Sequence, residues 1–175
     1  MKNRFPDLGP LAIPALGALM LLGAGTAVAE TSVSKADNSF VAKVSQGGMF
    51  EVEASKVAMQ KAVAQDVKDL SNTEVHDHTL VGDKLKSIAS SAGIALADKL
   101  NADFQGQLDS LSSLSGTAFD NAYIASMERI HAKDGAAFAQ EAQIGSNSQL
   151  RAFATETHRI VERHIGALHG EGPEK

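Results

Sequence analysis

Apolar side chains recur at intervals of three and four residues through most of this chain, and this spacing places them on one face of an α-helix. The pattern predicts four long helices, over about 40–64, 65–92, 117–144 and 148–168, and a shorter helix over about 98–113. No stretch alternates apolar and polar residues as a half-buried strand would. We therefore expect an all-α protein, an antiparallel four-helix bundle with one additional short helix.

The first long helix carries two local signals. Asp37-Asn38-Ser39 offers an N-cap just before the apolar stripe begins, because short polar side chains accept hydrogen bonds from the free amides at a helix start. Gly47-Gly48 lies inside the same helix, where each glycine costs roughly 1 kcal/mol relative to alanine. Such a pair is expected where another helix or a ligand approaches closely, or where the helix kinks.

The N-terminal segment has the three parts of a secretory signal. Lys2 and Arg4 form a basic start, 11–29 is almost wholly apolar, and Ala27-Val28-Ala29 supplies the small residues of a cleavage site. We therefore expect an exported, periplasmic protein. The alternative is an uncleaved anchor, because the apolar stretch approaches the length of a membrane span. The expected division is a signal peptide at 1–29, a linker at 30–36, a helical bundle domain at 37–169 and a flexible tail at 170–175.

Charge and composition narrow the classes of partner. Without the signal, 14 basic and 20 acidic residues remain, and a mildly acidic domain without a basic stripe argues against a nucleic-acid partner. No later apolar run is long enough to cross a bilayer, so we expect no integral membrane segment after signal cleavage. The chain has no cysteine, which excludes thiol catalysis, iron–sulfur clusters and cysteine zinc sites. A homo-oligomer stays open.

Four ionisable residues fall near the middle of the four long helices. Glu51 and His78 are almost equally far from the expected turn near residue 65, and His131 and His164 are similarly far from the turn near residue 146. Their side chains therefore reach a common layer of the bundle. Glu and His at one level are the ligands of bundle metal sites, and they suit Zn, Fe, Mn, Ni or Cu. The residues expected to support this layer are Glu74, Asp77, Tyr123 and Glu128.

A single metal or small-ligand site is one of three interpretations. The same residues would also form a buried polar network that fixes helix register, in a non-catalytic structural or envelope-stress protein that acts through its surface. The third interpretation is a ferritin-like metal oxidase. Glu128 and His131 have the E-x-x-H spacing of helical di-iron sites, but such a site needs two of these elements and the chain has one. For buried, neutral imidazoles we expect stability to fall below about pH 6.

Short matches in a fixed order also run along the mature chain. They include Gly47-Gly48-Met49-Phe50-Glu51-Val52, Asp77-His78-Thr79, LSSLSG at 111–116, Phe119-Asp120-Asn121-Ala122-Tyr123 and Leu150-Arg151-Ala152-Phe153-Ala154. Taken together, the chain resembles the exported bacterial family of domain of unknown function 4142 over nearly all of residues 38–168.

The resemblance implies a ferritin-like helical bundle outside the cytoplasm, and it implies no particular activity. Two positions depart from the family pattern. Glu74 stands where that pattern has Met, and Thr157-His158 stands where it has Leu-Pro. The second change removes a proline kink, and the first places a carboxylate one helical turn from His78.

Overall fold

The computed structural model describes residues 32–170, and this part of the chain folds into five helices with no strand. The helices are α1 (Lys35–Lys61), α2 (Gln65–Ser91), α3 (Ala102–Ser112), α4 (Gly116–Ile144) and α5 (Ser148–Leu168). The predicted all-α fold, with four long helices and a short one, is confirmed. The expected signal peptide at 1–29 and residues 171–175 of the expected tail lie outside the described residues.

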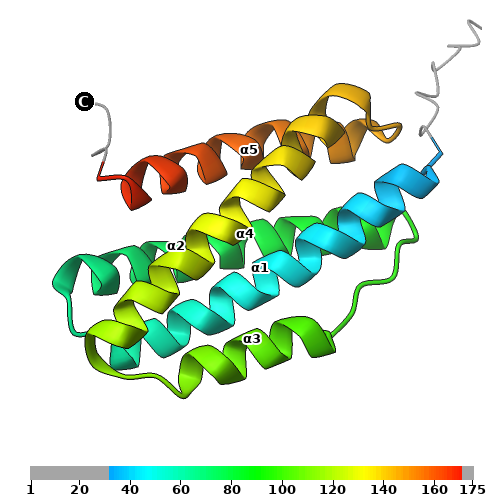
Figure 1. Cartoon of the computed structure of the whole chain (residues 1–175). Coiled ribbons are helices and arrows are strands. Elements are labelled where there is room, and N and C mark those ends of the chain that lie inside the picture. The colour runs from blue at the N-terminus through cyan, green and yellow to red at the C-terminus, as the bar shows by residue number, and fades with distance from the viewer. Residues whose placement is uncertain (1–31, 171–175) are drawn as a thin grey trace, which may run out of the picture.

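Two antiparallel hairpins and one crossover make up the bundle (Figure 1). Residues 62–64 connect α1 to α2, and residues 145–147 connect α4 to α5. The chain from 92 to 115 runs back along the bundle and carries α3 beside α1 (Figure 1). Contacts of α1 with α4 and of α2 with α5 close the four-helix arrangement. A single long crossover between two hairpins is the connection of ferritin-like folds.

Helix α1 begins earlier than the apolar pattern indicated. Ser34 is the N-cap: its hydroxyl accepts a hydrogen bond from the Asp37 amide at 3.0 Å, and the Asp37 carboxylate accepts one from the Ser34 amide at 2.7 Å. The predicted cap at Asp37-Asn38-Ser39 is therefore wrong, because Asp37 is the third helical residue of a capping box. Asp37 also accepts from the Ser146 amide at 2.8 Å, which joins the start of α1 to the α4–α5 turn.

The paired glycines of α1 have different surroundings. A Cβ on Gly47 would lie 2.1 Å from Oδ2 of Asp134 on α4, so any other residue there would displace the buried Asp134 carboxylate. A Cβ on Gly48 would have no atom within 4 Å. The close contact expected for the pair therefore applies to Gly47, and Gly48 faces open space.

Two separate apolar clusters fill the bundle, and a polar layer lies between them. One cluster is built around Phe40, Phe138 and Phe153, and the other around Phe119 and Met127. On α2 and α4, buried ionisable residues fall between the positions that belong to the two clusters, and on α1 and α5 they lie close to the boundary between them. None of the described helices is long and apolar enough to cross a membrane.

Candidate metal centre

The polar layer contains five ionisable side chains that are almost completely shielded from solvent. Each long helix contributes at least one of them, and none is more than 4% exposed. They are Glu51 on α1, Glu74 and His78 on α2, His131 on α4 and His164 on α5. The structure thus brings the four residues singled out in the sequence into one layer, together with Glu74.

Two of the imidazoles have ring orientations fixed by acceptors outside the layer. Nδ1 of His131 lies 2.8 Å from the carbonyl oxygen of Met127, one turn earlier on α4. Because a carbonyl only accepts, this nitrogen carries the hydrogen. Nε2 of His164 donates to the Asp77 carboxylate at 2.9 Å, and Arg163 donates to the same Asp77 oxygen. In their neutral forms, His131 and His164 therefore direct lone pairs from their other nitrogens into the layer.

Those two lone-pair nitrogens face each other. Nε2 of His131 and Nδ1 of His164 are 3.2 Å apart. Two unprotonated nitrogens at this distance repel each other, so the contact requires either an additional proton or a cation between them.

The third imidazole follows the same arrangement. Nδ1 of His78 lies 3.1 Å from Oε2 of Glu51, and its Nε2 lies 3.1 Å from Oε2 of Glu74. A carboxylate that accepts from one ring nitrogen while the other faces a metal is a common arrangement of histidine ligands. Here Glu51 occupies that outer position for His78, as Asp77 does for His164.

Glu74 lies at the centre of the cluster. Its oxygens are 3.1 Å from His78 Nε2, 3.4 Å from His131 Nε2 and 3.2 Å from His164 Nδ1. Despite these distances, both Glu74 oxygens and His78 Nε2 are buried without a hydrogen-bond partner among the described residues. One ligand atom from each of the four residues lies within 4.8 Å of the other three. Metal–ligand bonds of about 2.0–2.1 Å place tetrahedral ligand atoms about 3.3 Å apart, which is close to the contacts around Glu74.

The electrostatics of the layer are dominated by contacts between carboxylates and imidazoles. Burial raises the pKa of Glu74, but the imidazoles of His131, His164 and His78 close to its oxygens outweigh burial and hold that pKa well below its usual range. Burial lowers the pKa of His131, but Glu74 and Glu51 outweigh burial and raise it to about 9. The pKa of His78 is also raised, because the carboxylates of Glu51 and Glu74 outweigh the lowering by burial.

These pKa directions contradict one expectation from the sequence. Imidazoles that are buried and neutral would lose stability below about pH 6, but the carboxylates beside His78 and His131 keep these rings protonated to higher pH. The prediction failed because burial alone was considered. The sequence does not give the distance between Glu74 and the rings.

The other residues expected to support the site have different positions. Asp77 is at the edge of the layer, where it accepts from His164. Tyr123 is completely buried in the neighbouring apolar cluster, with its hydroxyl 2.8 Å from Ser55 Oγ. Glu128 is exposed to solvent, so its E-x-x-H spacing with His131 does not bring both side chains into the layer.

Two contacts at the layer were not assigned from the sequence. The Met127 carbonyl orients His131, and Asp134 packs against Gly47 beside the layer. Burial and Glu51 raise the pKa of Asp134 to about 7. Gly47 was the available signal for a close contact, but its partner on α4 could not be identified without the packing of α1 on α4.

The fold and the polar layer define an all-α bundle of ferritin-like topology with a buried centre of histidines and carboxylates. The chain belongs to the DUF4142 family, described as a domain of unknown function, whose model matches residues 22–169. The structure is similar to the crystal structure of a DUF305 fragment from Deinococcus radiodurans, with a TM-score of 0.70 and 11% sequence identity over 79% of this chain and 96% of that chain. At this identity the similarity concerns the fold alone. A comparison with curated proteins found no match.

Proposed function

We propose that this protein binds a single transition-metal ion through Glu74, His78, His131 and His164. The observation that carries the proposal is the set of buried, unpaired donor atoms around Glu74. A buried polar atom without a partner costs about 1–3 kcal/mol, and a cation at the centre of the cluster would give several of these atoms a partner at once. In this assignment Glu51 orients His78 and does not bind the ion.

The donor set limits the metal. Three imidazole nitrogens and one carboxylate suit Zn, Fe, Mn, Ni or Cu. The ligands come from three helices and are shielded from solvent, and four ligands from the protein are typical of sites that hold an ion without an open position for chemistry. We therefore propose a non-catalytic role in binding or sensing a metal, and not turnover by a ferritin-like oxidase.

Export is part of the proposal. The basic start, the apolar stretch and the Ala27-Val28-Ala29 cleavage pattern support secretion to the periplasm. Metal bound there would come from the extracytoplasmic supply. Recovery of mature protein beginning at Glu30 from the periplasmic fraction is the expected result, and a membrane-bound chain that retains residues 1–29 would mean an uncleaved anchor.

The metal proposal is tested by elemental analysis of untagged protein from the periplasm. Wild type should contain about one equivalent of a transition metal, and Glu74→Gln and His131→Ala should each lose it. Glu128→Gln is the matched control, because it makes the same change on an exposed residue outside the layer. Folding is checked for each variant by circular dichroism and urea unfolding.

The competing interpretation predicts a different result. If the layer is only a structural network, folded wild type will contain no metal even after incubation with Zn, Fe and Cu. His131→Ala will then only destabilise the fold, by roughly 1–3 kcal/mol, because its buried partners lose a contact. That outcome would assign the protein to structural or envelope-stress functions performed by its surface.

A further inference from the structure

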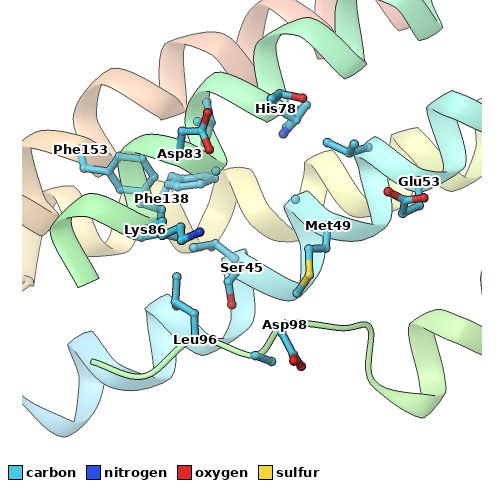
Figure 2. Close-up of a pocket in the computed structure, with 18 of the residues that line it drawn as sticks. Ser45, Met49, Glu53, His78, Asp83, Lys86, Leu96, Asp98, Phe138 and Phe153 are labelled. Atoms are coloured by element: carbon cyan, nitrogen blue, oxygen red, sulfur yellow. The ribbon is translucent and has the colours of Figure 1, made fainter. Parts of the chain in front are cut away.

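A groove of about 460 Å³ runs between the outer faces of α1 and α2. Residues 96–98 of the crossover line it on one side, and the rings of Phe138 and Phe153 lie at one end (Figure 2). His78 also lines the groove, and its ring is the one member of the polar layer that does so. The groove is therefore a concave space outside the metal cluster, with one residue in common, and its volume lies in the usual range of small-molecule pockets.

Two glycines line the groove from opposite helices. Gly48 of α1 and Gly82 of α2 both face it, and a Cβ built on either would have no atom within 4 Å. Each lies inside a long helix, where glycine is less favourable than alanine by roughly 1 kcal/mol. Gly47 is explained by its contact with Asp134, but no protein atom explains Gly48 or Gly82. Because neither residue has a side chain, this part of the groove stays open.

The polar atoms of the groove are largely satisfied within the protein. The hydroxyl of Ser45 donates to the Ala42 carbonyl at 3.1 Å, and that of Thr79 donates to the Val75 carbonyl at 2.6 Å. At the rim, Lys56 pairs with Glu53 at 2.8 Å. The walls are made by the apolar side chains of Val44, Met49, Val52, Val81, Leu85 and Leu96. The groove thus offers apolar surface and few free donors to an occupant.

The charge at the rim selects against anions. The acidic residues Glu53, Asp83 and Asp98 outnumber the basic residues Lys56 and Lys86 around the groove. The chain as a whole has a net charge of −5. A negatively charged molecule therefore meets repulsion on approach, whereas an uncharged apolar molecule does not.

We propose that this groove binds an uncharged, largely apolar small molecule, which lies across Gly48 and Gly82 with one end against His78. The apolar walls provide most of the binding energy, because burial of apolar surface is favourable in proportion to its area. This site is separate from the proposed metal site, with which it shares His78. Its occupant contacts the outer side of His78, whereas the metal would lie on the side of Glu74.

The proposal is tested with N-phenylnaphthylamine, an uncharged probe that fluoresces in apolar surroundings, and full-length mature protein. Wild type should bind the probe saturably. Gly48→Leu and Gly82→Leu each extend a side chain into the groove from a Cβ position with no atom within 4 Å, so each should weaken binding at least about tenfold. Gly106→Leu is the matched control, because it makes the same substitution in α3 with nothing within 4 Å and outside this groove.

Each outcome decides the proposal. Loss of binding in both groove variants, with a free energy of unfolding no lower than that of wild type and with unchanged binding by Gly106→Leu, supports it. Binding that is unaffected by either leucine would overturn it. Anilinonaphthalene sulfonate, the same ring system with a negative charge, should bind more weakly, and equal affinity would overturn the assignment of an uncharged occupant. Metal content is measured on the same samples, so failure of this site is separate from failure of the metal site.

Discussion

Each of the three buried imidazoles holds one ring nitrogen in contact with an acceptor that is not one of the four proposed ligands, and turns the other nitrogen toward Glu74. The acceptors are the Met127 carbonyl for His131, Asp77 for His164 and Glu51 for His78. Ring orientation is therefore set by the protein before any ion arrives. Such outer contacts orient metal ligands and raise their basicity, which lowers the cost of assembling the site.

Glu51 and Glu74 are distinguished by one substitution each. Glu51→Gln should leave the metal stoichiometry intact and weaken the affinity by about 10–100-fold, because the amide oxygen still accepts from His78 but no longer carries charge. Glu74→Gln should remove stoichiometric binding. Affinities are measured by competition with a chelator. The reverse order of the two variants would make Glu51 the ligand, as the sequence first indicated.

Tyr123 belongs to the apolar cluster and not to the metal ligands. Its hydroxyl forms a buried hydrogen bond with Ser55; burial raises its pKa, with Glu74 and Glu51 adding to that rise. Tyr123→Phe should reduce the free energy of unfolding by about 1–2 kcal/mol, because Ser55 loses its partner, and should leave metal content unchanged. Ser55→Ala added to Tyr123→Phe should recover part of the loss. A large fall in metal content on Tyr123→Phe would contradict this separation.

Among the helices, the crossing of α1 and α4 carries the closest contact that a side chain would disturb. Gly47→Ala should destabilise the fold by about 1–3 kcal/mol, because the new methyl group overlaps Asp134 at a buried crossing. Gly48→Ala, one residue later in the same helix, should instead stabilise it by up to about 1 kcal/mol, since alanine favours the helix and meets no atom. Urea unfolding of both variants measures whether each substitution lowers or raises the free energy of unfolding.

The Gly47 result has an internal check. Truncating Asp134 to alanine in the Gly47→Ala background removes the overlapping atoms, so the double variant should be more stable than the two separate losses predict. Equal destabilisation by Gly47→Ala and Gly48→Ala would mean that helix propensity, and not the α1–α4 contact, determines the effect.

The helices were predictable because their sequence signals are local. Short connections at 62–64 and 145–147 fixed the heights at which Glu51, His78, His131 and His164 would lie. The role of Glu74 was not predictable, because it depends on how α2 is rotated about its axis, and a shift of one residue turns a helical side chain by about 100°. The Ser34 cap was missed for a local reason. Asp is a residue type that often caps helices, but Asp37 is the third residue of the helix, and the cap is Ser34, three residues earlier.

At the scale of the whole molecule, buried ionisable groups of the described residues lie in the layer between the apolar clusters and at both ends of the bundle. Asp120 accepts from the amides of the α1–α2 turn at one end, and Asp37 and Glu141 lie at the other, where α1 begins and α4 turns into α5. At that end Asp37 holds its charge, because the amides of Ser34 and Ser146 outweigh burial and lower its pKa. Glu141 lies beside it with a buried, unpaired Oε1. Burial and the neighbouring Asp37 raise the pKa of Glu141 to about 7.

This pair predicts a pH dependence of global stability with a definite sign. A carboxyl group whose folded pKa lies above its unfolded value binds more protons in the folded state, so its contribution is fully present below the unfolded value of 4.5 and is lost as pH rises to about 7. Glu141→Gln keeps a donor toward Asp37 without a charge. The variant should match wild type at pH 4.5 and exceed its free energy of unfolding by about 1 kcal/mol at pH 8.

The measurement is urea unfolding of both proteins across this range, in the presence of a chelator so that metal does not contribute. Glu128→Gln is the control, since that side chain is exposed and should give a difference near zero at every pH. A constant difference between Glu141→Gln and wild type would mean that Glu141 does not titrate in this window. A difference that grows between pH 4.5 and about 7 and then stays constant would locate the titration at the α4–α5 end, because the raised pKa of His131 places its loss of stability at higher pH, toward about 9.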